Sequence, residues 1–223
     1  MCGRFTTTFE FREIKLLFNL QRDFPSFKPR YNIAPSQDVP VIVRTDEGNE
    51  AKTMKWGLVP SWAHDPCIGN RMINARAETL TEKPSFKRLV GSHRCLVPAD
   101  GFYEWRQEGR RKVPVWIHLK DRKPFFFAGL WDFWRDRESE KEFYSFTIIT
   151  CEPNALLRSI HNRMPVIYDR EMGQQWLDPH FTGSPSFLAA VLQPLPSELM
   201  EMRDVSTLVN SPANDSPNCI EAV

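Results

Sequence analysis

Apolar residues along the chain recur first at helical spacing and then in the short runs that are typical of strands. The helical spacing extends from Phe11 to Phe18, directly after a Thr-x-x-Glu sequence that begins at Thr7 and resembles a capping box. Seven later stretches are rich in apolar and β-branched residues and predict strands, at residues 39–43, 51–56, 95–98, 101–105, 113–119, 124–133 and 143–150. Turn residues between 101 and 133 predict that the strands in this range form an antiparallel meander.

Four further segments have the pattern of short helices. They span residues 85–90, where Gly91 is expected to end the helix, and residues 153–159, 170–177 and 185–192. The elements lack the regular strand–helix alternation and the glycine-rich loop of a doubly wound nucleotide-binding fold. We therefore predict an α+β fold: a β-rich single domain over residues 1–223, with curved antiparallel sheets that form a partial barrel flanked by short helices. Residues 210–223 are expected to form a mobile tail or a loop laid over the surface.

Composition narrows the possible classes of protein. The 223 residues are 41% hydrophobic and 26% charged, which is close to globular averages and excludes wholesale disorder. The 29 basic residues nearly balance the 28 acidic ones, which argues against a globally basic nucleic-acid coat protein but leaves room for a local basic groove. No apolar run approaches the ~20 residues of a membrane helix. Because the N-terminal residues also lack the pattern of a signal peptide, we expect a cytoplasmic protein without a membrane partner.

The five cysteines are odd in number, widely spaced and without a Cys-x-x-Cys pair. This pattern predicts reduced thiols rather than a disulfide framework or a zinc ribbon. Two His/Cys pairs, His64 with Cys67 and His93 with Cys95, suggest a zinc site, but the second pair is too closely spaced for standard ligands. We therefore expect neither a metal nor a cofactor.

Cys2 is the residue with the most specific chemistry. Removal of Met1, which is normal before a small second residue, leaves Cys2 with a free α-amine beside its thiol. The reference pKa values of ~7.7–8.0 for the amine and ~8.5 for the thiol make both partly nucleophilic at neutral pH. Such an aminothiol condenses with an aldehyde to a Schiff base, and the thiol then closes a five-membered thiazolidine ring. The alternative is a small residue at a frayed terminus.

The surroundings of Cys2 and five later motifs favour the chemical interpretation. The six segments occur in a fixed order and are Cys2–Phe5, Arg30–Pro35, Trp56–Trp62, Asn74–Thr79, Gly101–Trp105 and Ile160–Pro165. Together they resemble the SRAP family, the SOS response-associated peptidases or abasic-site-processing proteins. The resemblance extends from residue 2 to about residue 168, with a looser closing element at Val205–Asn210.

The resemblance implies a specific activity and four catalytic residues. Proteins of this family recognise abasic sites in single-stranded DNA, and Cys2 would form the thiazolidine crosslink with the ring-opened sugar. Asn74 would hold the terminus or the sugar by hydrogen bonds, Glu104 would move protons during ring opening and Schiff-base formation, and His161 would be a second acid or base. On chemical grounds a carboxyl group and an imidazole beside one electrophile can supply these proton transfers. Each group typically increases the rate ~10²–10⁴-fold. Because Glu104 lies between Tyr103 and Trp105, partial burial would raise its pKa.

DNA-binding residues are expected close to the catalytic ones. Arg4, Arg76 and Arg163 each lie within two residues of a proposed catalytic position, which suits contacts to flanking phosphates. Two tryptophans, Trp62 and Trp105, are candidates for stacking on exposed bases, with core packing as the alternative.

Pro35 is a candidate wedge against the base stack. The basic run at residues 110–112 falls at a predicted hairpin tip and is interpreted as a solvated turn.

The sequence thus predicts a monomeric enzyme of the DNA-damage response. Its partner would be single-stranded DNA with abasic sites, and it would be nucleoid-associated when bound. Lyase cleavage through the same Schiff base and self-processing peptidase activity at Cys2 are part of this interpretation. Two alternatives stay open: a cysteine peptidase with Cys2 as nucleophile and His161 as base, and a non-covalent single-strand binding module.

Overall fold

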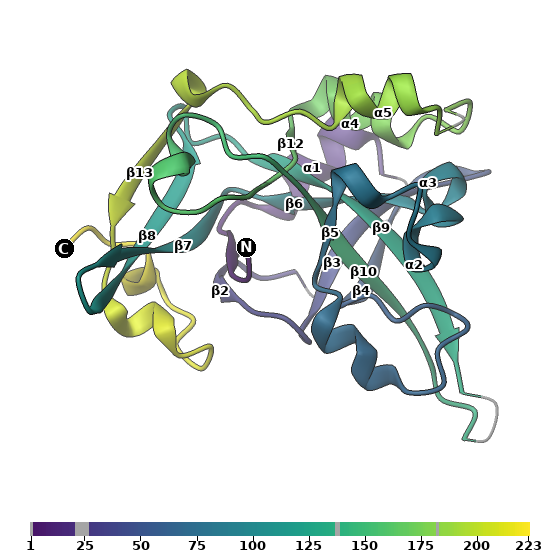
Figure 1. The fold of residues 1–223 in the computed structure, drawn as a ribbon, viewed down its shortest axis with the longest axis horizontal. Helices are drawn as coiled ribbons and strands as arrows, with labels where there is room; N and C mark the ends of the chain where they lie inside the picture. The colour runs from purple at the N-terminus through teal and green to yellow at the C-terminus, as the bar shows by residue number, and fades with distance from the viewer. Residues whose placement is uncertain (1, 21–26, 137–138, 182) are drawn as a thin grey trace.

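A closed barrel of five strands forms the centre of the molecule in the computed structural model, which describes residues 2–20, 27–136, 139–181 and 183–223 (Figure 1). The strands are β3 (Asp38–Thr45), β4 (Gly48–Trp56), β6 (Arg94–Ala99), β9 (Phe125–Arg135) and β10 (Glu142–Cys151). They pair in the order β10-β4-β3-β6-β9, and β9 pairs back to β10. The pairing of β10 with β4 is parallel and the others are antiparallel. The predicted β-rich fold with a barrel is confirmed, and the barrel is closed rather than partial.

A second sheet of five strands lies beside the barrel, on the left in Figure 1. Its order is β13-β8-β7-β1-β2, with β1 (Phe5–Thr7), β2 (Arg30–Ile33), β7 (Gly101–Glu108), β8 (Arg111–Leu119) and β13 (Met200–Asp204). The N-terminal strand β1 lies between β2 and β7, and all its pairings are antiparallel. The start of the chain is therefore an internal strand of a sheet.

The predicted meander over residues 101–133 is wrong beyond its first two strands. β7 and β8 form an antiparallel hairpin, but the second neighbour of β8 is β13, while β9 belongs to the barrel. The physical reason is the run Phe125–Leu130, which is buried at every position. A strand that is apolar on both faces is stabilised inside the barrel, whereas an outer hairpin would leave one face in water.

Three short strands attach loops to the ends of the barrel strands. β5 (Asn74–Arg76) runs parallel to β10, while β11 (Met164–Pro165) pairs antiparallel with the same strand. β12 (Ile167–Tyr168) pairs antiparallel with β9. The pairings bring the segments around residues 74 and 164 to the C-terminal half of β10.

Short helices surround the barrel, and α4 and α5 run along its upper side in Figure 1. The α-helices are α1 (Phe11–Phe18), α2 (Pro84–Lys87), α3 (Leu89–Ser92), α4 (Arg170–Leu177) and α5 (Pro185–Val191). The 3₁₀ turns are η1 (Pro66–Arg71), η2 (Ala77–Thr79), η3 (Leu157–Ser159), η4 (Ser197–Leu199), η5 (Thr207–Asn210) and η6 (Pro217–Cys219). None of the helices in the described ranges is long and apolar enough to cross a membrane.

The helix predictions hold with three corrections. The helix α1 is confirmed, but its capping box joins Glu10 and Glu13, because Thr7 belongs to β1. The helix expected to end at Gly91 is two short helices, and Gly91 lies inside the second one. Of the helix expected at 153–159, only η3 forms, after Pro153 and Asn154. Asn154 accepts a hydrogen bond from Leu157 N–H through its side chain, which favours a turn at this point.

An aromatic cluster fixes β1 between the two sheets. The Phe5 ring meets Trp56 edge-on at 5.1 Å and Phe127 at 5.7 Å, and Phe102 meets Phe127 at 6.0 Å. All four rings are buried, and each such side chain contributes roughly 1.5–3 kcal/mol on burial. This packing anchors Phe5 in the core and thereby positions the residues just before it.

Gly57 is required by a close backbone approach at the end of β4, and we expect Gly57→Ala to destabilise the fold more than Gly48→Ala. Both glycines have positive φ, at +123° and +125°, which alone costs an alanine roughly 1–3 kcal/mol. An added Cβ at Gly57 would lie 2.7 Å from the Gly69 carbonyl oxygen, whereas one at Gly48 would meet nothing within 4 Å.

Overpacking of this kind adds on the order of 1–3 kcal/mol. Urea unfolding of the two variants measures the difference. Equal losses of stability in Gly57→Ala and Gly48→Ala would show that the close approach to Gly69 is unimportant.

Candidate active site

Cys2 is completely buried, with 0% of its surface exposed, and lies three residues before β1. The backbone that follows Cys2 is held by a hydrogen bond, because Tyr103 N–H donates to the Arg4 carbonyl at 2.9 Å. The Asn74 side-chain amide donates to the Cys2 carbonyl oxygen at 2.9 Å. The alternative of a frayed terminus is therefore wrong for Cys2. Met1, whose removal the sequence predicts, lies outside the described residues.

Asn74 reaches Cys2 because β5 is locked to the barrel. Its parallel register with β10 places Asn74 opposite Ile148, and the Trp56 indole N–H donates to the Ile73 carbonyl at 2.9 Å. Asn74 is itself only partly buried. The segment that carries Asn74 is thus fixed from two sides, and the Asn74 side-chain amide contacts the backbone of Cys2.

Glu104 lies on β7 and is buried, with 4% of its surface exposed. Burial raises the pKa of its carboxyl group, which confirms the expected direction of the shift. The pKa of the Cys2 thiol is also raised, first by burial and then by the charge of Glu104. Burial therefore favours the protonated forms of both the Glu104 carboxyl group and the Cys2 thiol.

His161 lies in the loop between η3 and β11. The Arg163 backbone N–H donates to His161 Nδ1 at 3.1 Å. Burial lowers the pKa of the His161 imidazole, so the neutral form is favoured. A backbone N–H can only donate, and the neutral ring must then carry its proton on Nε2.

Arg163 is held by contacts within the protein. Its guanidinium donates to both carboxylate oxygens of Glu78, at 2.7 and 2.9 Å, and to the Thr150 carbonyl at 2.5 Å. Glu78 belongs to η2, directly after β5, whereas Arg163 directly precedes β11. Sequence analysis missed Glu78, although it lies within the Asn74–Thr79 motif.

Arg4 is held only by neutral acceptors among the residues that the structure describes. Its Nη1 donates to Asn32 Oδ1 at 2.7 Å and to the Val209 carbonyl at 2.6 Å, and its guanidinium lies 5.7 Å from the centroid of the Trp105 ring. Partial burial lowers the pKa of this guanidinium. Within the described ranges its hydrogen-bond acceptors are thus an amide oxygen and a backbone carbonyl, neither of which carries a charge.

The C-terminal residues 207–219 cover β2 and complete the surroundings of Arg4. The Asn32 side-chain amide donates to the carbonyls of Ser211 at 2.9 Å and Asn214 at 2.7 Å. Asp215 accepts from the Tyr31 and Asn32 backbone N–H groups. Sequence analysis did not single out Asn32, and the motif Arg30–Pro35 that contains it is the signal that could have done so.

The remaining predicted DNA-binding residues lie at or near the surface. Trp62 is 52% exposed, Arg76 is exposed, and Pro35 is partly buried. The Trp105 indole N–H donates to Asn210 Oδ1 at 2.7 Å, and its ring is partly buried. The structure brings Cys2 together with Asn74 and Glu104, and it brings Arg4 together with Trp105.

The loop that carries Trp62 is supported by buried polar groups. Val59 N–H donates to the Ser145 hydroxyl at 2.8 Å, and Ser61 N–H donates to the buried Asp132 carboxylate at 2.8 Å. The exposed indole therefore projects from a rigid segment. Such a side chain is suited to stacking on a flat ligand.

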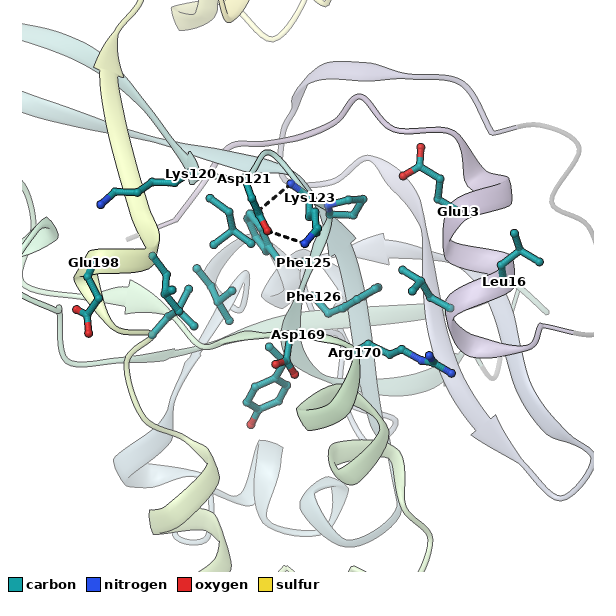
Figure 2. A pocket seen from close by; sticks show the side chains of 17 residues that line it. Glu13, Leu16, Lys120, Asp121, Lys123, Phe125, Phe126, Asp169, Arg170 and Glu198 are labelled. Carbon is teal, nitrogen blue, oxygen red and sulfur yellow. Dashed lines mark hydrogen bonds and ion pairs between the residues drawn. The ribbon is translucent and has the colours of Figure 1, made fainter.

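No group of three or more His, Cys, Asp and Glu side chains within the described ranges could hold a metal ion. A large pocket of about 960 Å³ lies elsewhere, between α1, the β8–β9 turn and the start of α4 (Figure 2). Phe125 and Phe126 lie on its floor, and charged side chains such as Lys120 and Glu198 surround it. None of the ten predicted site residues lines this pocket.

Together, the two sheets bury Cys2 near the start of the chain, with the Asn74 amide on its carbonyl and a buried glutamate, Glu104, on the strand that pairs with β1. The sequence model of the SOS response associated peptidase (SRAP) family matches residues 1–212, and the chain belongs to this family. It is 47% identical over 225 residues to the abasic site processing protein YoqW of Bacillus subtilis (strain 168), with both chains fully covered.

More distant relatives show the same relationship. The chain is 32% identical over 231 residues to the abasic site processing protein HMCES of Xenopus tropicalis, covering 90% of this chain and 68% of the relative. A crystal structure of a protein from Bacteroides thetaiotaomicron superposes with a TM-score of 0.90 at 29% identity, over the full length of both chains. The fold is therefore of the SRAP type.

Proposed function

We propose that this protein captures abasic sites in single-stranded DNA by a covalent thiazolidine bond to Cys2. One observation carries the proposal: the fold buries Cys2 completely and holds its carbonyl with the Asn74 side-chain amide. Glu104, on the strand β7 that pairs with β1, is buried as well. Relatives that match 90–100% of this chain are named abasic site processing proteins, which supports the same substrate.

The first step is Schiff-base formation. After loss of Met1, the Cys2 amine attacks the aldehyde carbon of the ring-opened sugar and forms a carbinolamine. Loss of water then gives the imine, and the leaving hydroxyl takes a proton from an acid. Glu104 fits this role, because burial raises the pKa of its carboxyl group and keeps it protonated at higher pH than usual.

The second step closes the ring. The Cys2 sulfur bonds to the imine carbon, the C=N pair moves to nitrogen, and the thiol proton passes to that nitrogen. No oxidant or reductant is needed. Because burial raises the pKa of the thiol, a thiolate is scarce, and the amine is the group that attacks the aldehyde first. Asn74 holds the Cys2 backbone during both steps.

His161 is proposed as a hydrogen-bond donor near the sugar. In its neutral form it presents Nε2–H as a donor, since Nδ1 accepts from the Arg163 backbone. Lyase cleavage follows from the same imine: loss of a C2′ proton expels the 3′ phosphate by β-elimination. β-Elimination and closure of the thiazolidine ring therefore compete for the same imine.

A self-directed peptidase reaction is the remaining part of the proposal. Cleavage of the Met1–Cys2 bond by Cys2 would expose the amine that the first step requires, and the family description includes a peptidase. Mass spectrometry of active protein is expected to find Met1 absent. Equal activity of a form that retains Met1 would contradict the proposed role of the amine.

The DNA would lie across the surface that carries the predicted binding residues. Arg4, Arg76 and Arg163 are proposed for phosphate contacts, and the charge of Arg4 has only neutral partners in the described part of the chain. Trp62 and Trp105 are proposed for base stacking. Pro35 is proposed as a wedge.

One experiment tests the proposal against non-covalent binding. The protein is incubated with a single-stranded oligonucleotide that contains an abasic site, and in parallel with its borohydride-reduced form, which lacks the aldehyde. We expect a complex that survives denaturing electrophoresis only with the aldehyde. Equal binding to both oligonucleotides, with no denaturant-resistant complex, would show a non-covalent module instead.

We expect Arg76→Ala to weaken DNA binding in a salt-dependent way. Arg76 is exposed at the end of β5, two residues after Asn74, where its charge can meet a phosphate. Loss of one phosphate contact on a single strand lowers the slope of log K against log salt by about 0.7. Fluorescence anisotropy with the reduced oligonucleotide measures this slope without covalent trapping.

Arg110→Ala is the matched control, because Arg110 is exposed at the β7–β8 hairpin tip. Its slope should equal that of the unaltered protein. An Arg76→Ala slope that matches the control would remove Arg76 from the interface.

A further inference from the structure

The ion pair between Glu78 and Arg163 joins the two segments that flank the C-terminal half of β10. Glu78 follows β5, which carries Asn74, and Arg163 follows His161 by two residues. Both carboxylate oxygens take part, at 2.7 and 2.9 Å. The bidentate geometry restrains the guanidinium far more than a single contact would.

Arg163 is also tied to β10 and is mostly shielded from water. Its Nη2 donates to the Thr150 carbonyl at 2.5 Å, and only 12% of its side-chain surface is exposed. The hydrogen bond from Arg163 lowers the pKa of the Glu78 carboxyl group, which shows that the ionised pair is favoured. The position of Arg163 is therefore set by η2 and β10 together.

The backbone of Arg163 transmits this restraint to the imidazole. Its N–H donates to His161 Nδ1 at 3.1 Å, across a tight turn of two residues. The clamped guanidinium restrains the turn at residues 161–163, and release of the side chain would loosen this turn and weaken the contact of the N–H with Nδ1. The ring could then carry its neutral proton on either nitrogen, and its orientation would be less restricted.

We propose that Glu78 is a positioning residue: by clamping Arg163, it keeps the Arg163 N–H on His161 Nδ1 and so selects the neutral Nε2–H form of His161. The role of this form in catalysis rests on the function proposed above. Glu78 itself touches neither the sugar nor Cys2 in this scheme, and it acts through Arg163.

The test uses Glu78→Ala with a readout that does not depend on activity. In ¹⁵N spectra of the free protein, His161 is expected to show one tautomer, with its signal assigned by its loss in His161→Gln. In Glu78→Ala a second tautomer should appear. Glu78→Asp, which keeps the charge on a shorter side chain, should lie between the two.

The kinetic readout separates positioning from DNA binding. At saturating abasic single-stranded oligonucleotide, Glu78→Ala should form the adduct on the order of 10- to 100-fold more slowly, because a misplacement of about 1 Å can cost about 10²-fold. The oligonucleotide concentration at half-saturation should not rise, because Glu78→Ala leaves the charge of Arg163 available for the phosphate contact proposed above. Glu82→Ala, which removes an exposed carboxylate nearby, should match the unaltered protein in both readouts.

Either of two results would overturn the proposal. One is a single, unchanged His161 tautomer in Glu78→Ala. The other is a normal rate at saturation with a raised half-saturation concentration, which would place Glu78 in DNA binding. If the unaltered protein forms no aldehyde-dependent adduct, the proposed function fails, and the tautomer measurement still decides the role of Glu78.

Discussion

Cys2→Ser is expected to abolish the denaturant-resistant complex with abasic single-stranded DNA while leaving a complex that borohydride can trap. Serine is small enough to allow loss of Met1, so the variant keeps its α-amine. The amine still forms the imine, but a hydroxyl is a much weaker nucleophile than a thiol and does not close a durable ring. The imine therefore hydrolyses unless it is reduced.

Two gels separate the steps of this reaction. Denaturing electrophoresis without borohydride measures ring closure, and the same gel after borohydride treatment measures imine formation. Cys67→Ser is the matched control, because Cys67 has an exposed thiol far along the chain in η1. A durable complex in Cys2→Ser would mean that the thiol is not the closing group, and absence of any trapped complex would contradict attack by the amine.

Glu104→Gln is expected to slow adduct formation by about 10²–10⁴-fold, which is the range for loss of a general acid or base. Glutamine keeps the size of the side chain and removes its proton. Burial raises the pKa of the Glu104 carboxyl group, so the acid form persists to higher pH than for an ordinary glutamate. The variant tests this proton directly.

The pH profile gives the sign of the effect. The rate should first rise with pH as the α-amine loses its proton near its reference pKa of ~7.7–8.0. It should then fall as the Glu104 carboxyl group loses its proton at its raised pKa. Where that pKa lies below the pKa of the amine, the rising and falling limbs overlap and give one narrow maximum. In Glu104→Gln the falling limb should be absent. A profile of unchanged shape at reduced rate would assign the acid to another group.

Stability offers an independent check on the same carboxyl group. A folded-state pKa above the unfolded value of ~4.3 means that the contribution of Glu104 to stability is fully present below the unfolded pKa. It is lost as pH rises through the folded pKa. Urea unfolding should therefore show stability declining with pH over this window in the unaltered protein and less so in Glu104→Gln.

Strands were predictable because their apolar runs carry the information locally. Every predicted strand from residue 39 to residue 150 lies within or largely within an observed one. Which strands pair depends on residues far apart in sequence. The run Phe125–Leu130 indicates a strand but does not say that its partners are β6 and β10 rather than β8.

The candidate site, too, was predictable from the sequence only in part. Motif order led to Cys2, Asn74 and Glu104, and the fold joins them across separations of 72 and more residues. The carboxylate that holds Arg163 was not predicted. Glu78 lies 85 positions from Arg163, and nothing local in either segment indicates that the two charges meet.

By itself, the sequence determined the element types, the barrel-like β-rich fold and the chemistry available at Cys2, because hydrophobic spacing and side-chain reactivity are local properties. Only the tertiary structure decided the rest. It placed Cys2 in a buried internal position and raised the pKa values of its thiol and of Glu104. It also gave Arg4 neutral hydrogen-bond acceptors, and it paired Arg163 with the carboxylate of Glu78. Burial and long-range contacts decide those properties, and both arise only when distant segments pack together.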